Sequence, residues 1–225
     1  SAFDMLLMQH PEEKSLSLSG NMNSGVLSTK LGIKGIPEEA EVIQVERDLR
    51  LAEMTEGRIH FFNITTSLAL NSITIAKKRG IKVTCSTSPH YFNLCENDIR
   101  KWRTYAKVSP PLRNEKNMNA IRTGILNNEI DCITSDHSPH DTDSKRLPFE
   151  QASSGVIGFE SLLPLTLKLI NDKKFSYKKL VELLSLNPSK ILKLNSGTLK
   201  KRRPADLILI DFNKNVKLSS SLIKS

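Results

Sequence analysis

Short apolar segments alternate with helical patterns over the first two thirds of the chain. In the helical patterns apolar residues recur every three to four positions, which predicts helices over residues 37–55, 67–79, 114–126 and 158–170. The apolar segments that precede these helices are FDMLLMQH, RIHFFNITT, IKVTCSTSPH and EIDCITSDHSPH. Four strand–helix pairs in succession are typical of βαβ units, so the pattern predicts a parallel sheet.

The remainder of the chain has two different patterns. The segment SYKKLVELLSLNPSKILKL predicts two short helices separated at Asn187–Pro188. Residues 197–218 show the period-two alternation of an edge strand or a small sheet. We therefore predict two parts, residues 1–195 with the strand–helix pairs and residues 196–225 as a β-rich tail.

Polar residues accumulate where each predicted strand ends. They are His10, Asn63, Thr65, His90, Asp136 and His140. In a (β/α) barrel the loops that follow the strands converge on the active site, so we expect these side chains to share one mouth. A complete barrel of this type needs eight strands and about 250 residues, whereas this chain offers four strands in 225 residues. The pattern predicts an α/β fold with about four β/α units, half of a TIM barrel.

The chain begins with Ser1 and opens directly on a strand pattern. We expect the other half of the barrel to precede this sequence in the natural protein or to come from a second chain. Half of a parallel barrel leaves two strand edges unpaired and an apolar inner face open. This predicts self-association or docking onto another chain that completes the barrel.

Composition argues against several classes of protein. Hydrophobic residues make up 38% and charged residues 25% of the chain, the balance of a globular domain. No apolar run approaches the roughly 20 residues of a membrane span, and no charged segment followed by an apolar one marks a secretory signal. The three cysteines lack the CxxC spacing of a metal or redox site. We expect a cytoplasmic protein without membrane contact.

The net charge of +9 is concentrated at one end of the chain. Fourteen of the 33 Lys and Arg residues, but only four of the 24 Asp and Glu residues, lie from Lys168 onward. A basic segment that binds nucleic acid usually carries interleaved aromatic residues or a known module, and this tail has neither. We expect a solvated surface, with docking of an acidic partner as the alternative, and no nucleic-acid partner.

The segment DCITSDHSPH carries the strongest candidate chemistry. Asp136 leaves an apolar strand directly into a loop, and His140 follows beyond a proline. A carboxylate in such a place ligates Zn²⁺ and moves protons, and metal-bound water becomes hydroxide near neutral pH. His10 is either an imidazole ligand or a strand-end histidine satisfied by backbone groups. We expect His137 to brace the loop by hydrogen bonding.

Two further segments combine a rigid turn with a possible ligand contact. The ordinary interpretation of SPPLR is a loop anchor, with Arg113 in a surface ion pair. The segment SSGVIGFE leads into a predicted helix, whose first turn either binds an anion or is only the entry of the helix.

Taken together, these segments resemble the class I dihydroorotases of the amidohydrolase superfamily. The resemblance rests on DCITSDHSPH, LPFEQASSGVIGFESLLPL, AKVSPPLR, NPSKILKL and GTLKKRRPADLILID, with QHPEEKSLS, NMNSGVLSTKLGIKGIPEEAE and RIHFFNITT in the same order. It implies a (β/α)₈ barrel with a small β-sandwich, to which the tail contributes, and a site with two zinc ions. It also implies reversible hydrolysis of dihydroorotate to N-carbamoyl-aspartate in pyrimidine biosynthesis.

The resemblance implies roles for individual residues. Asp136 matches the aspartate that is both a metal ligand and the general acid/base of the family. His10 matches a zinc-binding histidine. His140 matches the residue that holds the substrate carboxylate, and Gly155 matches a glycine of the substrate loop.

Departures from the family pattern fall at the same site. Asn63 stands at the position of a zinc-binding histidine, and an amide oxygen is a poorer zinc ligand than an imidazole. Ser109 and Ser154 occupy substrate-site positions at which the family has Asn and Phe, and Tyr91 replaces a His. The HxHxR strand and the DDG aspartate of the family are absent from the sequence. The chain therefore offers two of six expected metal ligands.

The leading interpretation is a dihydroorotase-type amidohydrolase in an incomplete or inactive form, which binds fewer than two zinc ions and does not turn over dihydroorotate by itself. The alternative is a catalytically silent, dihydroorotase-like scaffold that supports aspartate transcarbamoylase. Hydantoinases and allantoinases share the barrel, but the segments from DHSPH to GFE and SPPLR fit them less well.

Overall fold

The structure is a computed structural model that describes residues 5–99, 102–171, 175–212, 214, 217, 219, 223 and 224. At its centre is a four-stranded sheet in the order β1-β4-β5-β6, in which every neighbouring pair is parallel. The strands are β1 (Leu6–Gln9), β4 (Arg58–Phe61), β5 (Val83–Thr87) and β6 (Cys132–Ile133). The predicted α/β architecture, a partial (β/α) barrel, is confirmed.

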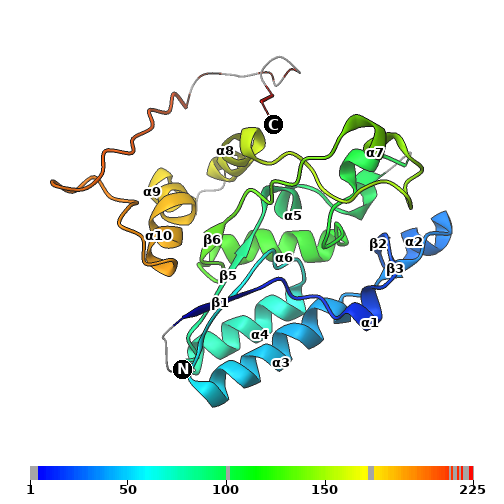
Figure 1. Ribbon diagram of the computed structural model, residues 1–225, viewed down its shortest axis with the longest axis horizontal. Helices are drawn as coiled ribbons and strands as arrows, with labels where there is room; N and C mark the ends of the chain where they lie inside the picture. The colour runs from blue at the N-terminus through cyan, green and yellow to red at the C-terminus, as the bar shows by residue number, and fades with distance from the viewer. Residues whose placement is uncertain are drawn as a thin grey trace.

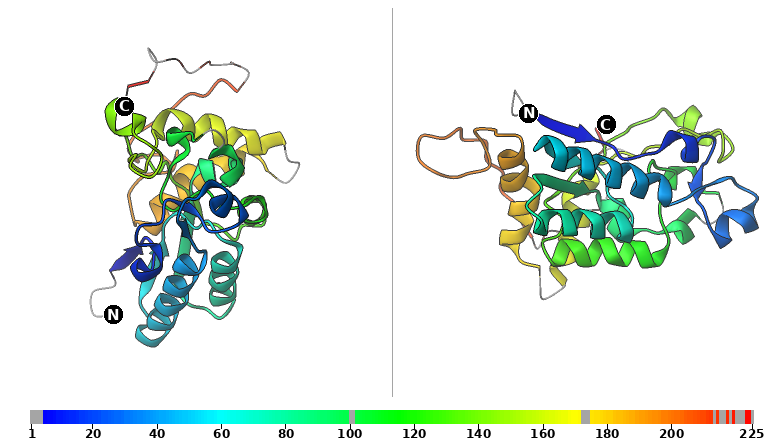
Figure 2. Two further views of the ribbon diagram at one scale, coloured as in Figure 1. Left: turned by 90° about the vertical axis from the view of Figure 1, so that its right-hand side faces the viewer. Right: turned by 90° about the horizontal axis from the view of Figure 1, so that it is seen from below.

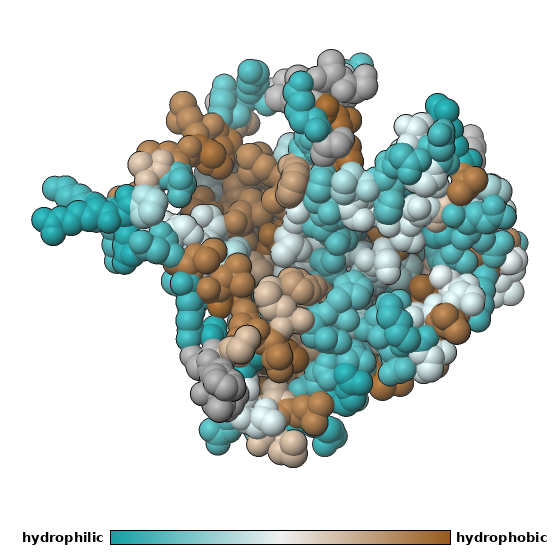
Figure 3. All heavy atoms as spheres, viewed as in Figure 1, coloured by the Kyte–Doolittle hydropathy of each residue, from teal (hydrophilic) through white to brown (hydrophobic). Residues whose placement is uncertain are grey.

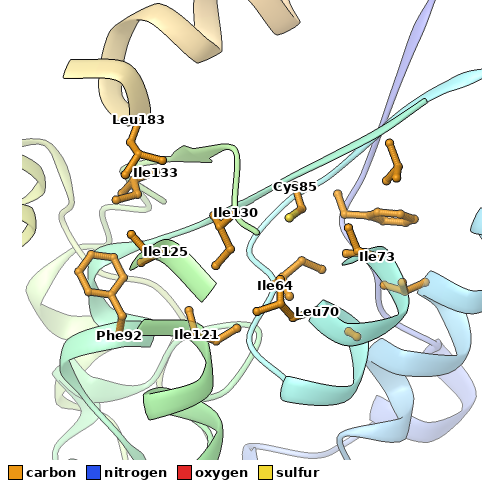
Figure 4. Packing of buried hydrophobic residues seen from close by; sticks show 14 of the residues in the cluster. Ile64, Leu70, Ile73, Cys85, Phe92, Ile121, Ile125, Ile130, Ile133 and Leu183 are labelled. Atoms are coloured by element: carbon orange, nitrogen blue, oxygen red, sulfur yellow. The ribbon is translucent and has the colours of Figure 1, made fainter. Parts of the chain in front are cut away.

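Three long helices lie side by side against one face of the sheet (Figures 1 and 2). They are α3 (Glu39–Thr55), α4 (Ser67–Lys78) and α6 (Glu115–Leu126). Their apolar faces meet the strands in the main core, where Ile64, Ile73, Cys85 and Ile121 are fully buried (Figure 4). Burial of each large aliphatic side chain contributes about 1.5–3 kcal/mol, so this layer dominates the stability of the sheet.

Capping side chains fix where two of these helices begin. The side chain of Thr66 accepts a hydrogen bond from the backbone N–H of Ala69 at the start of α4, and Asn114 accepts one from Asn117 at the start of α6. Each cap satisfies a backbone donor that the helix leaves free and contributes about 1 kcal/mol. The predicted helices over residues 67–79 and 114–126 therefore begin within one residue of the expected positions.

A smaller lobe lies beyond the carboxyl ends of the strands (Figure 1). Its elements are α1 (Lys14–Ser17), β2 (Met22–Asn23), α2 (Val26–Leu31), β3 (Gly35–Ile36), α5 (Pro89–Asn93), α7 (Thr142–Arg146) and two 3₁₀ turns at Glu96–Ile99 and Thr104–Ala106. The parallel pair of β2 and β3 lies between the first predicted strand and the helix predicted from residue 37. Met22, Tyr91 and Leu112 belong to a second core that holds this lobe together.

The helical stretch that follows the sheet differs from the prediction. Its elements are α8 (Phe159–Leu167), a 3₁₀ turn at Lys168–Asn171, α9 (Tyr177–Val181), a π turn at Glu182–Leu186 and α10 (Asn187–Ile191). The two predicted short helices are present, and the second begins at Asn187, but the chain between them is a π turn, so that it stays helical from Tyr177 to Ile191. Pro188 has no N–H to donate to the preceding turn, and the wider π turn before it accommodates that missing bond.

The predicted β-rich tail has no strand among its described residues up to residue 212. Leu207, Ile208 and Leu209 are exposed, so the period-two alternation has no pairing partner in the described part of the chain. The division at residue 195 stays a prediction. Among the described residues, no helix has both the length and the apolar character that a membrane crossing requires.

The strands β1 and β6 form the two ends of the sheet. On β1 the side chain of Leu7 is 66% exposed, and Met8 beside it is also exposed. In Figure 3 apolar side chains gather over the left half of the visible face, whereas the right half, over α2 and α7, is mainly polar. An unpaired strand edge with apolar side chains is a surface on which another strand pairs readily.

Candidate functional site

The loops that follow β1, β4 and β6 bring three predicted site residues together. Asn63 lies two residues beyond β4 and Asp136 three residues beyond β6. With His10 and His137 they line a cavity of about 390 Å³ at the carboxyl end of the sheet. Asn63 and Asp136 both have left-handed backbone conformations, with φ of 48° and 47°. Asn and Asp adopt this conformation more readily than other side-chain-bearing residues, so both loops turn sharply at the site.

The carboxylate of Asp136 is held by two side chains from neighbouring loops. Asn63 Nδ2 donates a hydrogen bond of 2.8 Å to Asp136 Oδ1. His90 Nε2 lies 3.1 Å from Asp136 Oδ2. This Nε2 is buried and has no aligned hydrogen-bond partner among the described residues, so the contact is a close polar approach rather than a linear hydrogen bond.

Two hydroxyl groups fix the orientation of the Asn63 amide. Ser88 Oγ donates to Asn63 Oδ1 at 2.7 Å, and Thr134 Oγ1 donates to the same oxygen at 3.2 Å. Because both hydroxyls are donors to the amide oxygen, the amide nitrogen faces Asp136. Asn63 therefore satisfies one oxygen of the Asp136 carboxylate.

The surroundings of Asp136 keep its carboxyl group ionised. Burial by itself favours the neutral form and raises the pKa. The contacts with His90 and Asn63 favour the charged form and outweigh burial, so the pKa of Asp136 lies below the ordinary value of 3.8. At neutral pH Asp136 is therefore an ionised carboxylate.

The predicted substrate loop lies next to this cavity. His140 Nε2 is 2.8 Å from the backbone oxygen of Ser154, and Ser154 is exposed. Gly155 is buried, with φ of 142°, and an added Cβ would lie 2.7 Å from the backbone oxygen of Ser138. Only glycine fits there. An isolated bridge between His137 and Val156 joins this loop to the one that carries Asp136.

His137 has the bracing role that its position predicts. Its Nδ1 accepts a hydrogen bond of 3.1 Å from the backbone N–H of Gly158. Its ring stacks on Phe159, with 3.9 Å between the ring centroids. The first residue of α8 and the loop of Asp136 are thereby fixed to each other.

The SPPLR turn contributes differently from the prediction. Ser109 is exposed and does not line the cavity that Asp136 lines. The hydroxyl of Tyr91 donates to the backbone oxygen of Pro110 at 2.9 Å and so holds the turn. The predicted surface ion pair of Arg113 is wrong. Arg113 and Glu41 are both buried, with 3.8 Å between Nη2 and Oε2.

The residues present do not form a complete zinc site. Among the residues that the structure describes, no group of three or more His, Cys, Asp or Glu side chains is placed to hold a metal ion. Zinc sites in proteins use three or four such side chains. The Asn63 amide oxygen is turned towards Ser88 and away from Asp136, so it does not complete the set. His10 and Asp136 remain as a partial ligand set.

Sequence reasoning missed the contact between His90 and Asp136. Both residues follow strands, and the parallel pairing of β5 with β6 brings those strand ends side by side. His90 was recognised as a polar strand-end residue, but nothing in the local pattern distinguishes its partner. The partner of His90 could have been identified from the expectation that consecutive strands of the sequence are neighbours in the sheet.

Comparison with known proteins agrees with this geometry. Residues 36–224 match the model of the amidohydrolase family. The chain is 45% identical to a dihydroorotase of Geotalea daltonii over 92% of its own length and 49% of that protein. It is 46% identical to a dihydroorotase of Pelobacter propionicus over 91% of its length and 48% of that protein. The chain thus spans about half the length of these curated relatives.

A solved structure gives the same result for the fold. An L-hydantoinase of Arthrobacter aurescens superposes with a TM-score of 0.82 at 24% identity, over 98% of this chain and 51% of that protein. The family match covers most of the sequence, and the parallel sheet with its polar carboxyl end is the architecture that the match requires. This chain belongs to the amidohydrolase family.

Proposed function

We propose that this chain supplies the carboxyl-terminal half of a dihydroorotase-type active site, which hydrolyses dihydroorotate to N-carbamoyl-aspartate in pyrimidine biosynthesis. The observation that carries the proposal is the position of Asp136, an ionised carboxylate at the mouth of the cavity, next to the loop of His140 and Gly155. The similar dihydroorotases support the substrate class. The same pathway gives the expected location, the cytoplasm.

Each residue of this half-site has a task that its surroundings suit. Asp136 accepts a proton from the attacking water and returns it to the amide nitrogen that leaves, which requires a carboxylate that is ionised at neutral pH. His140 and the backbone around Gly155 hold the carboxylate of the substrate. Family membership implies a metal cofactor, and we infer zinc. Because the ligand set here is partial, we infer that residues outside this sequence supply further ligands, while Asn63 supplies none.

The open edge of the sheet is where those residues dock. A groove of about 360 Å³ runs between β1 and α3, lined by Leu7, Met8, Leu51 and Ala52 among others. Its apolar lining suits one further strand and its helix, the next β/α unit of a barrel. The curated relatives carry about as much sequence again as this chain. We infer that the equivalent of their first half, on this chain or another, fills the groove.

Co-expression of this chain with the amino-terminal half of the Geotalea daltonii dihydroorotase tests the proposal. We expect the two pieces to purify together and to hydrolyse dihydroorotate, while this chain alone does not. The matched control carries Asp136→Asn, which preserves the shape of the side chain and removes its charge. A stable complex without turnover would contradict the proposed activity.

The second candidate is a catalytically silent scaffold that supports aspartate transcarbamoylase. The observation in its favour is the hydrogen bond from Asn63 to Asp136, which satisfies the carboxylate in the absence of a metal ion. Asn63→His in the co-expressed complex separates the two candidates. Turnover that appears only in the Asn63→His complex favours a silent form, and co-sedimentation with aspartate transcarbamoylase tests its partner.

A further inference from the structure

Lys145 is buried beneath the substrate loop. It lies on α7 and only 3% of it is exposed. Its Nζ donates to the backbone oxygens of Ser153 and Gly155, at 2.8 Å and 2.9 Å. One ammonium group therefore fixes two carbonyls of this loop, on either side of Ser154.

Lys107 holds the same loop from the other side. It precedes the SPPLR turn and only 4% of it is exposed. Its backbone oxygen accepts a hydrogen bond of 2.9 Å from the N–H of Gly155. Its Nζ donates to Asn21 Oδ1 and to the backbone oxygen of Phe149, both at 2.7 Å, and to that of Glu150 at 3.0 Å.

Neither ammonium group is neutralised by a close carboxylate. Among the ion pairs of the described residues, none includes Lys107 or Lys145. Burial lowers the pKa of both lysines. The charge of Lys107 lowers the pKa of Lys145 further, whereas the charge of Glu150 raises the pKa of Lys107. Burial of a charged ammonium group costs more free energy than burial of a neutral donor, and a neutral donor would also satisfy the carbonyl groups. The positive charge of the two lysines beneath the loop therefore favours an anion on the other side of the loop.

The bond from Lys145 also orients the next amide. In a trans peptide the C=O and the N–H point in opposite directions. Because the carbonyl of Ser153 accepts its hydrogen bond from Lys145, the N–H of Ser154 points away from Lys145. A charged donor on a carbonyl polarises the whole peptide group and makes its N–H a stronger donor. His140, which contacts the oxygen of Ser154, adds a second polar group at this point.

We propose that Lys107 and Lys145 are positioning residues that hold residues 153–155 in their bound shape and, through the polarised Ser154 N–H, select a substrate that carries a carboxylate. This inference rests on the proposed function for the identity of the substrate. The alternative role is purely structural, in which the lysines hold the loop without affecting the choice of ligand.

The first test measures the loop in the chain itself and needs no activity. In Lys145→Met we expect the amide of Gly155 to exchange with solvent at least about tenfold faster than in the unmodified chain, because the loop opens locally. Lys116→Met removes the same charge from the exposed face of α6 and leaves this rate unchanged. The amides of β5 report whether the variant is folded. Unchanged exchange at Gly155 in a folded Lys145→Met would overturn the positioning role.

The second test measures selection with two probes, dihydroorotate and dihydrouracil, which lacks the carboxylate. We expect the unmodified chain to bind dihydroorotate about tenfold more tightly, a typical gain from one charge-assisted hydrogen bond. Lys145→Met loses this preference and Lys145→Arg, which keeps the charge, retains it. If the role is purely structural, Lys145→Met weakens the binding of both probes equally. An unchanged ratio of the two affinities in this variant overturns selection. Failure of the unmodified chain to bind either probe overturns selection by this chain. The exchange test still decides positioning, and turnover by the co-expressed complex decides the proposed function.

Discussion

Asn63 Nδ2 lies 2.8 Å from Asp136 Oδ1 and donates a hydrogen bond to it. This bond links the loops after β4 and β6 across the strand between them, and it satisfies a carboxylate that lies in a partly closed cavity. The relationship defines the state of the proposed half-site, because Asp136 is ionised and the residue opposite it is an amide that donates to it.

Replacement of Asn63 by Ala should destabilise the chain by about 1–3 kcal/mol, because Asp136, Ser88 and Thr134 each lose a hydrogen-bond partner. Urea denaturation measures the change. Asn119→Ala, at an exposed position of α6, should alter the free energy of unfolding by less than about 0.5 kcal/mol. Equal stability of the two variants would show that the Asn63 network contributes nothing.

His60 should make stability fall as the pH is lowered. Burial lowers its pKa to about 4, with the charge of Asp131 opposing this effect and that of Lys77 adding to it. The unfolded chain binds a proton at the ordinary pKa of 6.5, so stability is full above that pH and is lost as the pH falls from there towards 4. The loss is up to about 3 kcal/mol.

Denaturation of the unmodified chain and of His60→Gln across this pH range tests the effect. The amide introduced by His60→Gln keeps hydrogen-bonding capacity towards Thr84 and Ser86, which both contact the imidazole. Because the amide does not titrate, the stability of the unmodified chain relative to the variant should decrease as the pH falls below the ordinary value and level off above it. A difference that does not depend on pH would exclude His60 as the origin of the effect.

Arg113→Met should destabilise the chain by about 3–5 kcal/mol, because it leaves the buried carboxylate of Glu41 without its cation. Thr65 and Thr66 still donate to Glu41, which places the expected value at the lower end of that range. The double variant with Glu41→Gln should recover part of the loss. Thermal unfolding of the two single variants, the double variant and the unmodified chain gives the coupling energy directly, and a coupling near zero would mean that the two charges act independently.

The β1 edge should govern association of this chain with the missing half-barrel. Leu7→Lys places a charge in the apolar groove beside α3 and should weaken co-purification with the amino-terminal half of a relative. Val26→Lys, at a similarly exposed position on α2, should leave it unchanged. Sedimentation velocity distinguishes the two outcomes, and similar assembly of both variants would place the interface elsewhere.

The sequence predicts the sheet and its site well where the signal is local. The spacing of apolar residues and the capping residues locate α4 and α6 almost to the residue. The polar residues at the ends of the predicted strands indicate a shared site, and Asn63 and Asp136 do line one cavity. What it does not predict depends on distant partners. Arg113, in the loop before α6, is buried beside Glu41 of α3, and nothing around SPPLR indicates that distant partner.

The same limit applies to Lys145 and to Pro188. Lysine is a residue type that is normally exposed, but Lys145 is buried because α7 lies under a loop that follows it in the chain. Pro188 predicts a helix break from propensity alone, yet packing against β6 keeps the helix and a π turn accommodates the proline. Tertiary contacts decide both outcomes.

The most direct test of the account is the initial rate of dihydroorotate hydrolysis by the complex of this chain with the amino-terminal half of the Geotalea daltonii dihydroorotase, prepared with Asp136 intact and with Asp136→Asn. We predict measurable turnover with Asp136 and a loss of at least about a hundredfold with Asp136→Asn, the usual contribution of a general acid/base. Equal rates for the two complexes would contradict the claim that this chain provides the proton-transferring half of the site.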